Sequence, residues 1–187
     1  MFAAVGSNGA AALDAARAVG GAALVAVDRR RQPAFSALVL GEDRDRLGVV
    51  ADVGLYAVTV RRMRHQRRTW PAGTASPGVT AAYPMVRRPG LTHEQADAHW
   101  RDVHAPLALR HHPGMWHYHQ ISIDDVLAGP VWDGIALCAF ASAQDLSERF
   151  FGDDHDRDVI TADVARFSDV TGSPRRVRLV EWRFGAD

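Results

Sequence analysis

The chain has 187 residues, 47% of them hydrophobic, and is long enough to bury one full core or two small cores packed together. Lysine plus arginine and aspartate plus glutamate number 22 each, so no net charge is available to attract nucleic acid or an anionic membrane surface. The single cysteine, Cys138, excludes an intrachain disulfide, and no apolar run approaches the roughly 20 residues of a membrane-spanning helix. We expect a globular, cytoplasmic protein whose partner is neither nucleic acid nor membrane.

The first predicted elements have the order of a dinucleotide-binding unit: a strand, a turn with Gly6 and Gly9, a helix, and a second strand that ends near Asp28. The next strand, over residues 35–42, follows after a hairpin-length link that contains Pro33. A parallel nucleotide-binding sheet needs a helical crossover at this point. The pattern therefore favours an antiparallel arrangement over a nucleotide site.

The rest of the first half predicts a short helix over residues 43–54 and a strand over residues 55–64. The order is then β-α-β-β-α-β, which is that of a ferredoxin-like unit, and we assign it to residues 1–66. Residues 67–78 combine proline, glycine and small polar residues without periodicity, which is typical of a linker. A second unit is expected over residues 79–187.

The second half predicts the same order of elements. Its strands are expected at residues 79–88, 115–123, 134–142 and 175–184, and its helices at 91–104, 143–151 and 156–167. Thr92 and Gln95 have capping-box spacing at the start of the first helix, and Pro106 predicts that this helix ends near His104. The segment between the middle strands, residues 124–133, is rich in turn residues.

These patterns predict an α+β fold of tandem ferredoxin-like units. Each unit would form a four-stranded antiparallel sheet with two helices on one face, and the other face needs a cover. Two such sheets can bury these faces against each other in a barrel, either between the chains of a homodimer or within one chain. The linker is long enough for the barrel to close within one chain.

Six of the nine histidines lie between residues 99 and 120. His117 and His119 are two apart on a predicted strand and share a face, as two metal ligands on a strand do. No spacing in the sequence supplies the further ligands that a metal needs, so we expect both residues to be partly buried side chains and predict no metal site. His111 and His112 are expected in a solvated loop.

His104 and two carboxylates are the candidates for acid/base chemistry. His104 lies at the edge of an apolar helix face and near a helix end, where it could transfer protons or simply bond the last carbonyl groups. Asp163 falls on the apolar face of its own predicted helix and needs a partner, either an arginine or His104. Asp133 precedes Gly134 and fits a turn, but it is a second candidate to orient His104.

The second half resembles the EthD domains of the dimeric α+β barrel superfamily. The segments that carry the resemblance are "RRPGLTHEQADAHWRDVHAPLA" (87–108), "WHYHQ" (116–120), "WDGIALCAFASAQDLSERF" (132–150) and "DVARFSD" (163–169). The resemblance implies a barrel that acts on small organic molecules, as in ether degradation, dehydration of aromatic polyketides and lactone isomerisation. Relatives in the superfamily include cofactor-free monooxygenases and heme enzymes. His104 matches the family's histidine, and Tyr118 and Asp163 fall at motif positions.

We therefore predict a cofactor-independent enzyme for a small aromatic or polyketide-like molecule, with His104 as general acid/base and Asp163 or Asp133 orienting it. Dehydration, cyclisation and isomerisation all fit this chemistry. An oxidoreductase or monooxygenase, and a non-catalytic ligand-binding protein, are the alternatives, the latter because the first half resembles a degenerate copy without the histidine motif. The residues expected to bind the substrate are Tyr83, Trp100, His117, Tyr118, His119 and Phe140.

Overall fold

A computed structural model describes residues 1–27 and 33–185, and Asp28 of the nucleotide-like motif lies outside them. Both halves have the predicted order of elements. The first half contains β1 (Phe2–Gly6), α1 (Gly9–Val19), β2 (Ala22–Ala26), β3 (Ala37–Gly41), α2 (Arg44–Gly48) and β4 (Gly54–Arg64). The second half contains β5 (Val79–Met85), α3 (His93–His99), η1 (Trp100–His104), α4 (Ala105–His111), β6 (Met115–Ala128), β7 (Gly134–Phe140), α5 (Ala143–Glu148), α6 (Asp154–Phe167) and β8 (Val177–Arg183). None of the described helices is long and apolar enough to cross a membrane.

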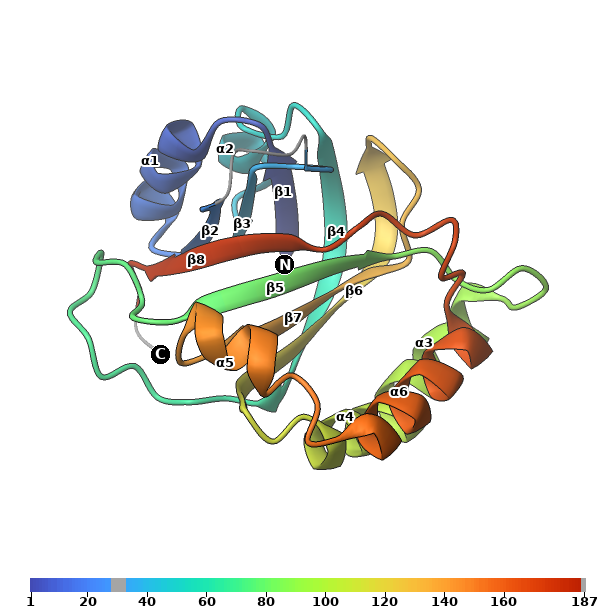
Figure 1. Cartoon of the computed structure of the whole chain (residues 1–187). Coiled ribbons are helices and arrows are strands. Elements are labelled where there is room, and N and C mark those ends of the chain that lie inside the picture. The colour runs from blue at the N-terminus through green and yellow to red at the C-terminus, as the bar shows by residue number, and fades with distance from the viewer. Residues whose placement is uncertain (28–32, 186–187) are drawn as a thin grey trace.

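The strands form one closed antiparallel barrel in the order β1-β3-β2-β8-β5-β7-β6-β4 (Figure 1). Each half contributes four adjacent strands in ferredoxin-like order, β4-β1-β3-β2 and β8-β5-β7-β6. Two pairings between the halves close the barrel: β2 with β8 and β4 with β6. The predicted barrel of two sheets is confirmed, and it closes within a single chain.

The interior of the barrel is an apolar core to which both halves contribute. Leu24 and Leu38 from the first half and Ile121 and Leu179 from the second are at most 1% exposed and belong to one cluster. Burying an aliphatic side chain of this size contributes roughly 1.5–3 kcal/mol. These shared contacts hold the two sheets together.

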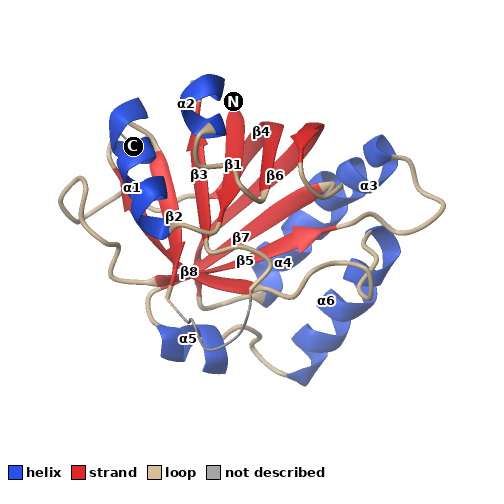
Figure 2. Cartoon of the chain, turned by 90° about the horizontal axis from the view of Figure 1, so that it is seen from above, coloured by secondary structure: helices blue, strands red, loops and turns tan. Residues whose placement is uncertain are grey.

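The helices cover the outside of the barrel in two groups, α1 and α2 over the first sheet and α3 to α6 over the second (Figure 2). In the first group, α1 packs through the small buried residues Ala12 and Ala16 in a cluster with Ala23 and Ala37 of the sheet. Alanine side chains let a helix lie close to a sheet, so this interface is filled by short side chains. The helix layer of the second sheet contains larger side chains and a cavity, described below.

The helix expected to end near His104 continues to His111, so this prediction was wrong. Between α3 and α4 the chain makes a π-helical turn, η1, in which the N–H of Ala105 bonds the carbonyl of Trp100 five residues back. The turn places Pro106 in the first turn of a new helix, where its missing N–H and fixed φ are tolerated. The helical segment therefore continues past Pro106, because the π-turn η1 comes directly before it.

Strand β6 is also longer than predicted, because it reaches Ala128 through the segment expected to be turn-rich. Its partner β4 has 11 residues, and the two strands pair from Arg64↔Tyr118 to Leu55↔Ala128 with register shifts on the way. Pairing with a long neighbour satisfies the backbone groups of the polar stretch after Ile123. The tertiary pairing outweighs the local turn preference.

Candidate active site

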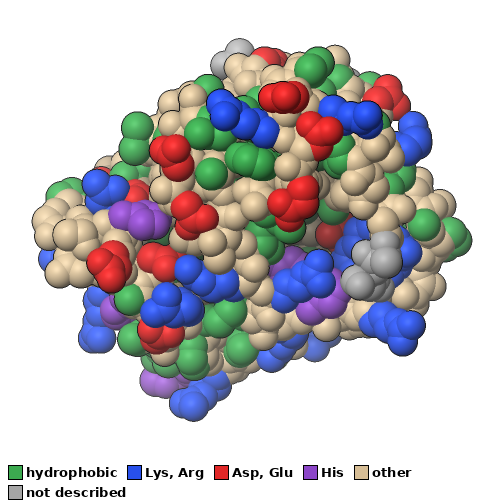
Figure 3. Space-filling view, turned by 180° about the vertical axis from the view of Figure 1, so that it is seen from behind, with side chains coloured by type: hydrophobic (Ala, Val, Ile, Leu, Met, Phe, Trp, Pro, Cys, Tyr) green, Lys and Arg blue, Asp and Glu red, His purple; other side chains and the backbone are tan. Residues whose placement is uncertain are grey.

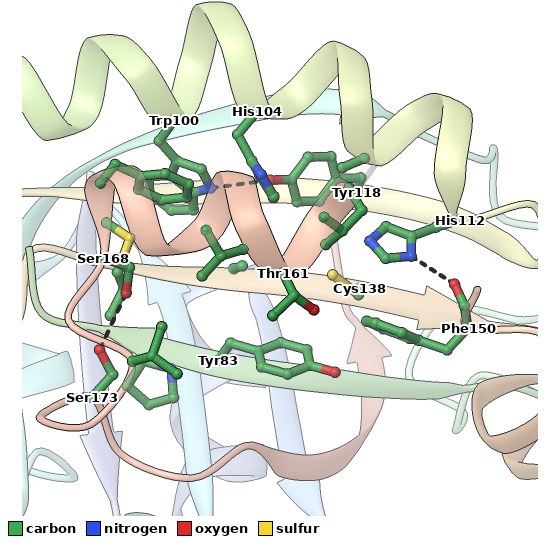
Figure 4. A pocket seen from close by; sticks show the side chains of 18 of the residues that line it. Tyr83, Trp100, His104, His112, Tyr118, Cys138, Phe150, Thr161, Ser168 and Ser173 are labelled. Carbon is green, nitrogen blue, oxygen red and sulfur yellow. Dashed lines mark hydrogen bonds between the residues drawn. The ribbon is translucent and has the colours of Figure 1, made fainter. Parts of the chain in front are cut away.

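A cavity of about 380 Å³ lies between the helices of the second half and the outer face of its sheet (Figure 4). Ligand pockets usually have volumes of about 300–1,000 Å³, so this one suits a small molecule. Most of its lining is apolar or aromatic, and the polar groups are few. The labelled lining residues include Tyr83, Trp100, His104, His112, Tyr118, Cys138, Phe150 and Thr161.

The π-helical turn positions two of these residues, Trp100 and His104, on the face that meets the cavity. The indole N–H of Trp100 donates to the hydroxyl of Tyr118 at 3.0 Å, and the amide of Gln120 donates to the same hydroxyl at 3.1 Å and to the carbonyl of Trp100 at 2.8 Å. Behind the indole, a Cβ at Gly134 would lie 2.5 Å from the Trp100 ring, so only glycine fits there. This network fixes the wall beside His104.

His104 and Asp163 form a buried pair at the edge of the cavity. Nδ1 of His104 lies 2.9 Å from Oδ2 of Asp163, and the exposed fractions of the two residues are 7% and 4%. The other carboxylate oxygen of Asp163, Oδ1, bonds Nε2 of His99 at 2.9 Å. A carboxylate only accepts hydrogen bonds, so Nδ1 of His104 carries the proton and, in the neutral ring, Nε2 has the lone pair. The structure thus brings together the two residues predicted to act as a pair.

Burial lowers the pKa of His104 below its usual value, and the hydrogen bond and charge of Asp163 oppose this effect without cancelling it. The imidazole is therefore neutral at physiological pH. A neutral histidine whose proton is fixed on Nδ1 by a carboxylate is in the form of a general base.

His112 is a second buried imidazole in the cavity, and the sequence did not predict it. The prediction of a solvated loop at residues 111 and 112 was wrong, because α4 continues to His111 and leaves His112 only 3% exposed. Nδ1 of His112 donates to the carbonyl of Phe150 at 2.6 Å, so its Nε2 also has a lone pair in the neutral ring. His111 bonds Asp156 at 2.5 Å.

His112 should make the folded protein sensitive to acid. Burial lowers its pKa to about 4, whereas the unfolded chain has a value of about 6.5, so the unfolded state binds more protons between these values. We expect this group to contribute about 3 kcal/mol above pH 6.5 and to lose that contribution as the pH falls to 4. Urea unfolding of wild type and His112→Phe at pH 7 and 4.5 measures it. Equal acid losses in both proteins would contradict the assignment.

Cys138 also lines the cavity, on β7. Burial raises the pKa of its thiol to about 12, so the thiol stays protonated and is a poor nucleophile. Cys138 therefore packs in the cavity wall as a small hydrophobic residue.

Three of the predicted binding residues, Tyr83, Trp100 and Tyr118, line the cavity, and Phe140 does not. Phe140 is fully buried behind the cavity wall, where its ring lies 5.6 Å from that of Phe150. The alternation of residues along β7 predicts which face of the sheet Phe140 lies on, but it does not predict how deeply the side chain is buried. Phe140 therefore supports the wall without reaching a ligand.

Asp133 does not orient His104, in contrast to that prediction. Its carboxylate accepts from the backbone N–H of Arg87 at 2.7 Å and the guanidinium of Arg87 at 2.6 Å, and it lies 3.1 Å from Nδ1 of His93. Burial would raise the pKa of Asp133, but these hydrogen bonds outweigh burial and lower it. Asp133 ties the start of α3 to the segment after β5, a structural role that differs from the turn residue expected from the sequence.

His117 and His119 lie on the opposite face of β6 from Tyr118 and point into the barrel, away from the cavity that His104 lines. The prediction that they contact the same ligand as His104 was wrong, since alternate residues of a strand face opposite sides of a sheet. Burial, together with the charges of the neighbouring His117 and His65, lowers the pKa of His119 to about 3. These histidines form a separate group.

The fold and this cavity define an α+β barrel in which one half carries a histidine-containing pocket. Residues 88–171 match the model of the EthD domain, so the resemblance seen in the sequence is confirmed over this segment. No curated protein matches the chain in sequence.

Two solved structures share the barrel. One is described as an anthrone oxidase-like protein, with 11% identity and a TM-score of 0.56, covering 98% of this chain and 92% of that one. The other is described as a candidate monooxygenase from Lactobacillus acidophilus NCFM, with 9% identity and a TM-score of 0.51, covering 100% of this chain and 96% of that one. At these identities the similarity shows the fold alone.

Proposed function

We propose that the protein is a cofactor-independent enzyme that moves a proton on a small aromatic or polyketide-like molecule bound in the cavity. The observation that carries this proposal is the His104–Asp163 pair, a neutral imidazole oriented by a buried carboxylate at the edge of an apolar pocket. Dehydration, cyclisation and isomerisation of such molecules all include transfer of a proton to or from carbon.

The walls of the cavity favour a flat, apolar ligand. Tyr83, Trp100, Phe150 and Phe167 supply aromatic surface, and aromatic ligands stack on such rings in offset or edge-to-face arrangements. Arg175 is also in the lining and offers a cation to a polar substituent. A polycyclic ketone with one or two hydroxyl groups meets these conditions.

In the proposed step, Nε2 of His104 removes a proton from a carbon whose deprotonation gives the enolate of the substrate's carbonyl group, either next to that group or, as in anthrone, joined to it through the aromatic rings. Asp163 stabilises the imidazolium that forms, since its carboxylate bonds the Nδ1 proton. The Tyr118 hydroxyl accepts bonds from Trp100 and Gln120, so its own hydrogen is left to donate to the enolate oxygen. The imidazolium then returns the proton to another atom of the substrate.

Anthrone is a suitable first probe, because it is a fused aromatic ketone with an acidic methylene group. Under nitrogen in D₂O, we expect the protein to accelerate deuterium exchange at that methylene group, as measured by NMR. Binding of anthrone without accelerated exchange would contradict acid/base catalysis and favour a non-catalytic binding protein.

The descriptions of the two similar structures favour a second candidate, oxidation of the deprotonated substrate by molecular oxygen. In that reaction anthrone and O₂ give anthraquinone and water, with His104 supplying only the deprotonation. Oxygen consumption and anthraquinone formation in air distinguish this function from isomerisation or dehydration, which consume no oxygen.

Activity should depend on pH through His104. Because burial holds the pKa of His104 below its usual value, the base form is lost only below about pH 6.5. We expect the exchange rate to rise with pH through an apparent pKa lower than 6.5 and then to remain constant. A rate that instead falls as the pH rises through that same apparent pKa would show that the protonated imidazole is the active form.

A further inference from the structure

Three histidines meet at one end of the barrel interior, away from the proposed active site. His117 and His119 alternate along β6 on the face that continues into the interior residues Ile121 and Ile123. His65 follows the last residue of β4, the strand that pairs with β6 at this end. The closed sheet separates the group from the cavity of His104.

The spacing of the three imidazoles is that of ligands around one ion. Nδ1 of His65 lies 3.1 Å from Nε2 of His119, and one ring nitrogen from each of the three residues lies within 4.8 Å of the others. Nitrogens bound at about 2.1 Å to a tetrahedral ion lie roughly 3.4 Å apart. The three ring centroids form a nearly equilateral triangle with sides of 5.1, 5.2 and 5.4 Å.

The group opens onto a second cavity, of about 610 Å³, which His65 and His119 line. On the rear face of the molecule, histidine and Lys/Arg side chains lie side by side at a hollow (Figure 3). The charged residues in this lining include Arg62, Glu181 and Arg183, and Glu181 pairs with Arg183 at 2.9 Å. An ion held by the three imidazoles would therefore keep a coordination position open to a small ligand from solvent.

Two hydrogen-bond donors contact the imidazole of His117. The backbone N–H of Gln66 donates to Nδ1 of His117 at 2.9 Å, and Nη2 of Arg183 lies 3.0 Å from Nε2 of the same ring. A metal ion bound by the His117 ring would take the place of one of these donors. Arg183 has the carboxylate of Glu181 as its acceptor, and Gln66 lies next to His65 in a segment without helix or strand, so either donor can give way.

We propose that His65, His117 and His119 form a binding site for a divalent transition metal, with Zn²⁺ as the first candidate. Imidazole nitrogens suit Zn²⁺, Cu²⁺ and Ni²⁺, whereas Mg²⁺ and Ca²⁺ need oxygen ligands. The two ligands on β6 come from one half of the chain and His65 from the other. The closed barrel brings His65 next to the other two ligands, so the sequence alone indicated only the pair His117 and His119.

Equilibrium dialysis of tag-free protein against Zn²⁺, followed by metal analysis, tests this proposal. We expect one Zn²⁺ per chain in the wild type. His119→Gln and His65→Gln should weaken binding by more than about 100-fold, since the loss of even an outer-shell partner costs about 10- to 100-fold. His155→Gln is the matched control, because His155 is exposed and lies outside the cluster.

Equal Zn²⁺ affinity in the wild type and in His65→Gln would overturn the proposal, as would a loss of binding in His155→Gln. Circular dichroism checks that each variant folds, and His65→Gln serves where His119→Gln does not. Co²⁺ bound in place of Zn²⁺ gives an independent readout, since its visible absorption should disappear with either cluster variant. Anthrone binding in the other cavity should be unchanged by Zn²⁺.

Discussion

His104→Gln is expected to slow proton transfer strongly while leaving ligand binding nearly intact. A positioned general base typically contributes 10²- to 10⁴-fold to a rate, so anthrone deuterium exchange should fall by about that factor. Glutamine keeps a polar side chain of similar reach at the buried edge of the cavity, but its amide is not a base near neutral pH. Anthrone affinity, measured by fluorescence titration, should change less than about threefold, because the aromatic walls are untouched.

His99→Gln is the matched control for this variant. His99 also bonds Asp163 at 2.9 Å, but it is 24% exposed and lies outside the cavity lining. The same substitution at this position removes a partner of the carboxylate without removing the proposed base. If His99→Gln slowed exchange as much as His104→Gln, the effect would belong to the shared carboxylate and not to His104 as a base.

Features set by local sequence were predictable. The capping box of Thr92 and Gln95 is present at the start of α3. The order of elements followed from periodicity and turn residues, and the uncovered sheet faces required a barrel. Each of these inferences needs only neighbours in sequence or a general need for burial.

The path of the backbone around Pro106 and the contacts between distant segments were not predicted. Pro106 reads locally as a helix end, and only the π-turn before it allows the helix to continue, which in turn buries His112. His65 was not considered with His117 and His119, because only the β4–β6 pairing between the halves brings them together. Hydrophobic periodicity did place Asp163 on a buried face, and this anomaly made Asp163 one of the two candidate partners of His104.

Asp163→Asn should identify how the carboxylate acts on His104. The negative charge of Asp163 raises the pKa of His104 against the effect of burial, so its removal should lower that pKa further. The acid limb of the exchange rate should then move to lower pH, while the plateau falls by roughly 10²- to 10⁴-fold because the imidazolium loses its stabilising partner. A purely structural carboxylate would lower stability without moving the acid limb.

Asp133→Asn provides the comparison for this last prediction, because Asp133 is a carboxylate of similar burial, 3% exposed against 4% for Asp163, whose partners are Arg87 and His93. Both variants remove a buried negative charge that accepts hydrogen bonds from its neighbours, so both should destabilise the fold. Only Asp163→Asn should shift the pH profile, since only Asp163 touches His104. An unchanged acid limb in Asp163→Asn, or an equal shift in both variants, would mean that the pair observed in the structure does not govern the titration of the catalytic base.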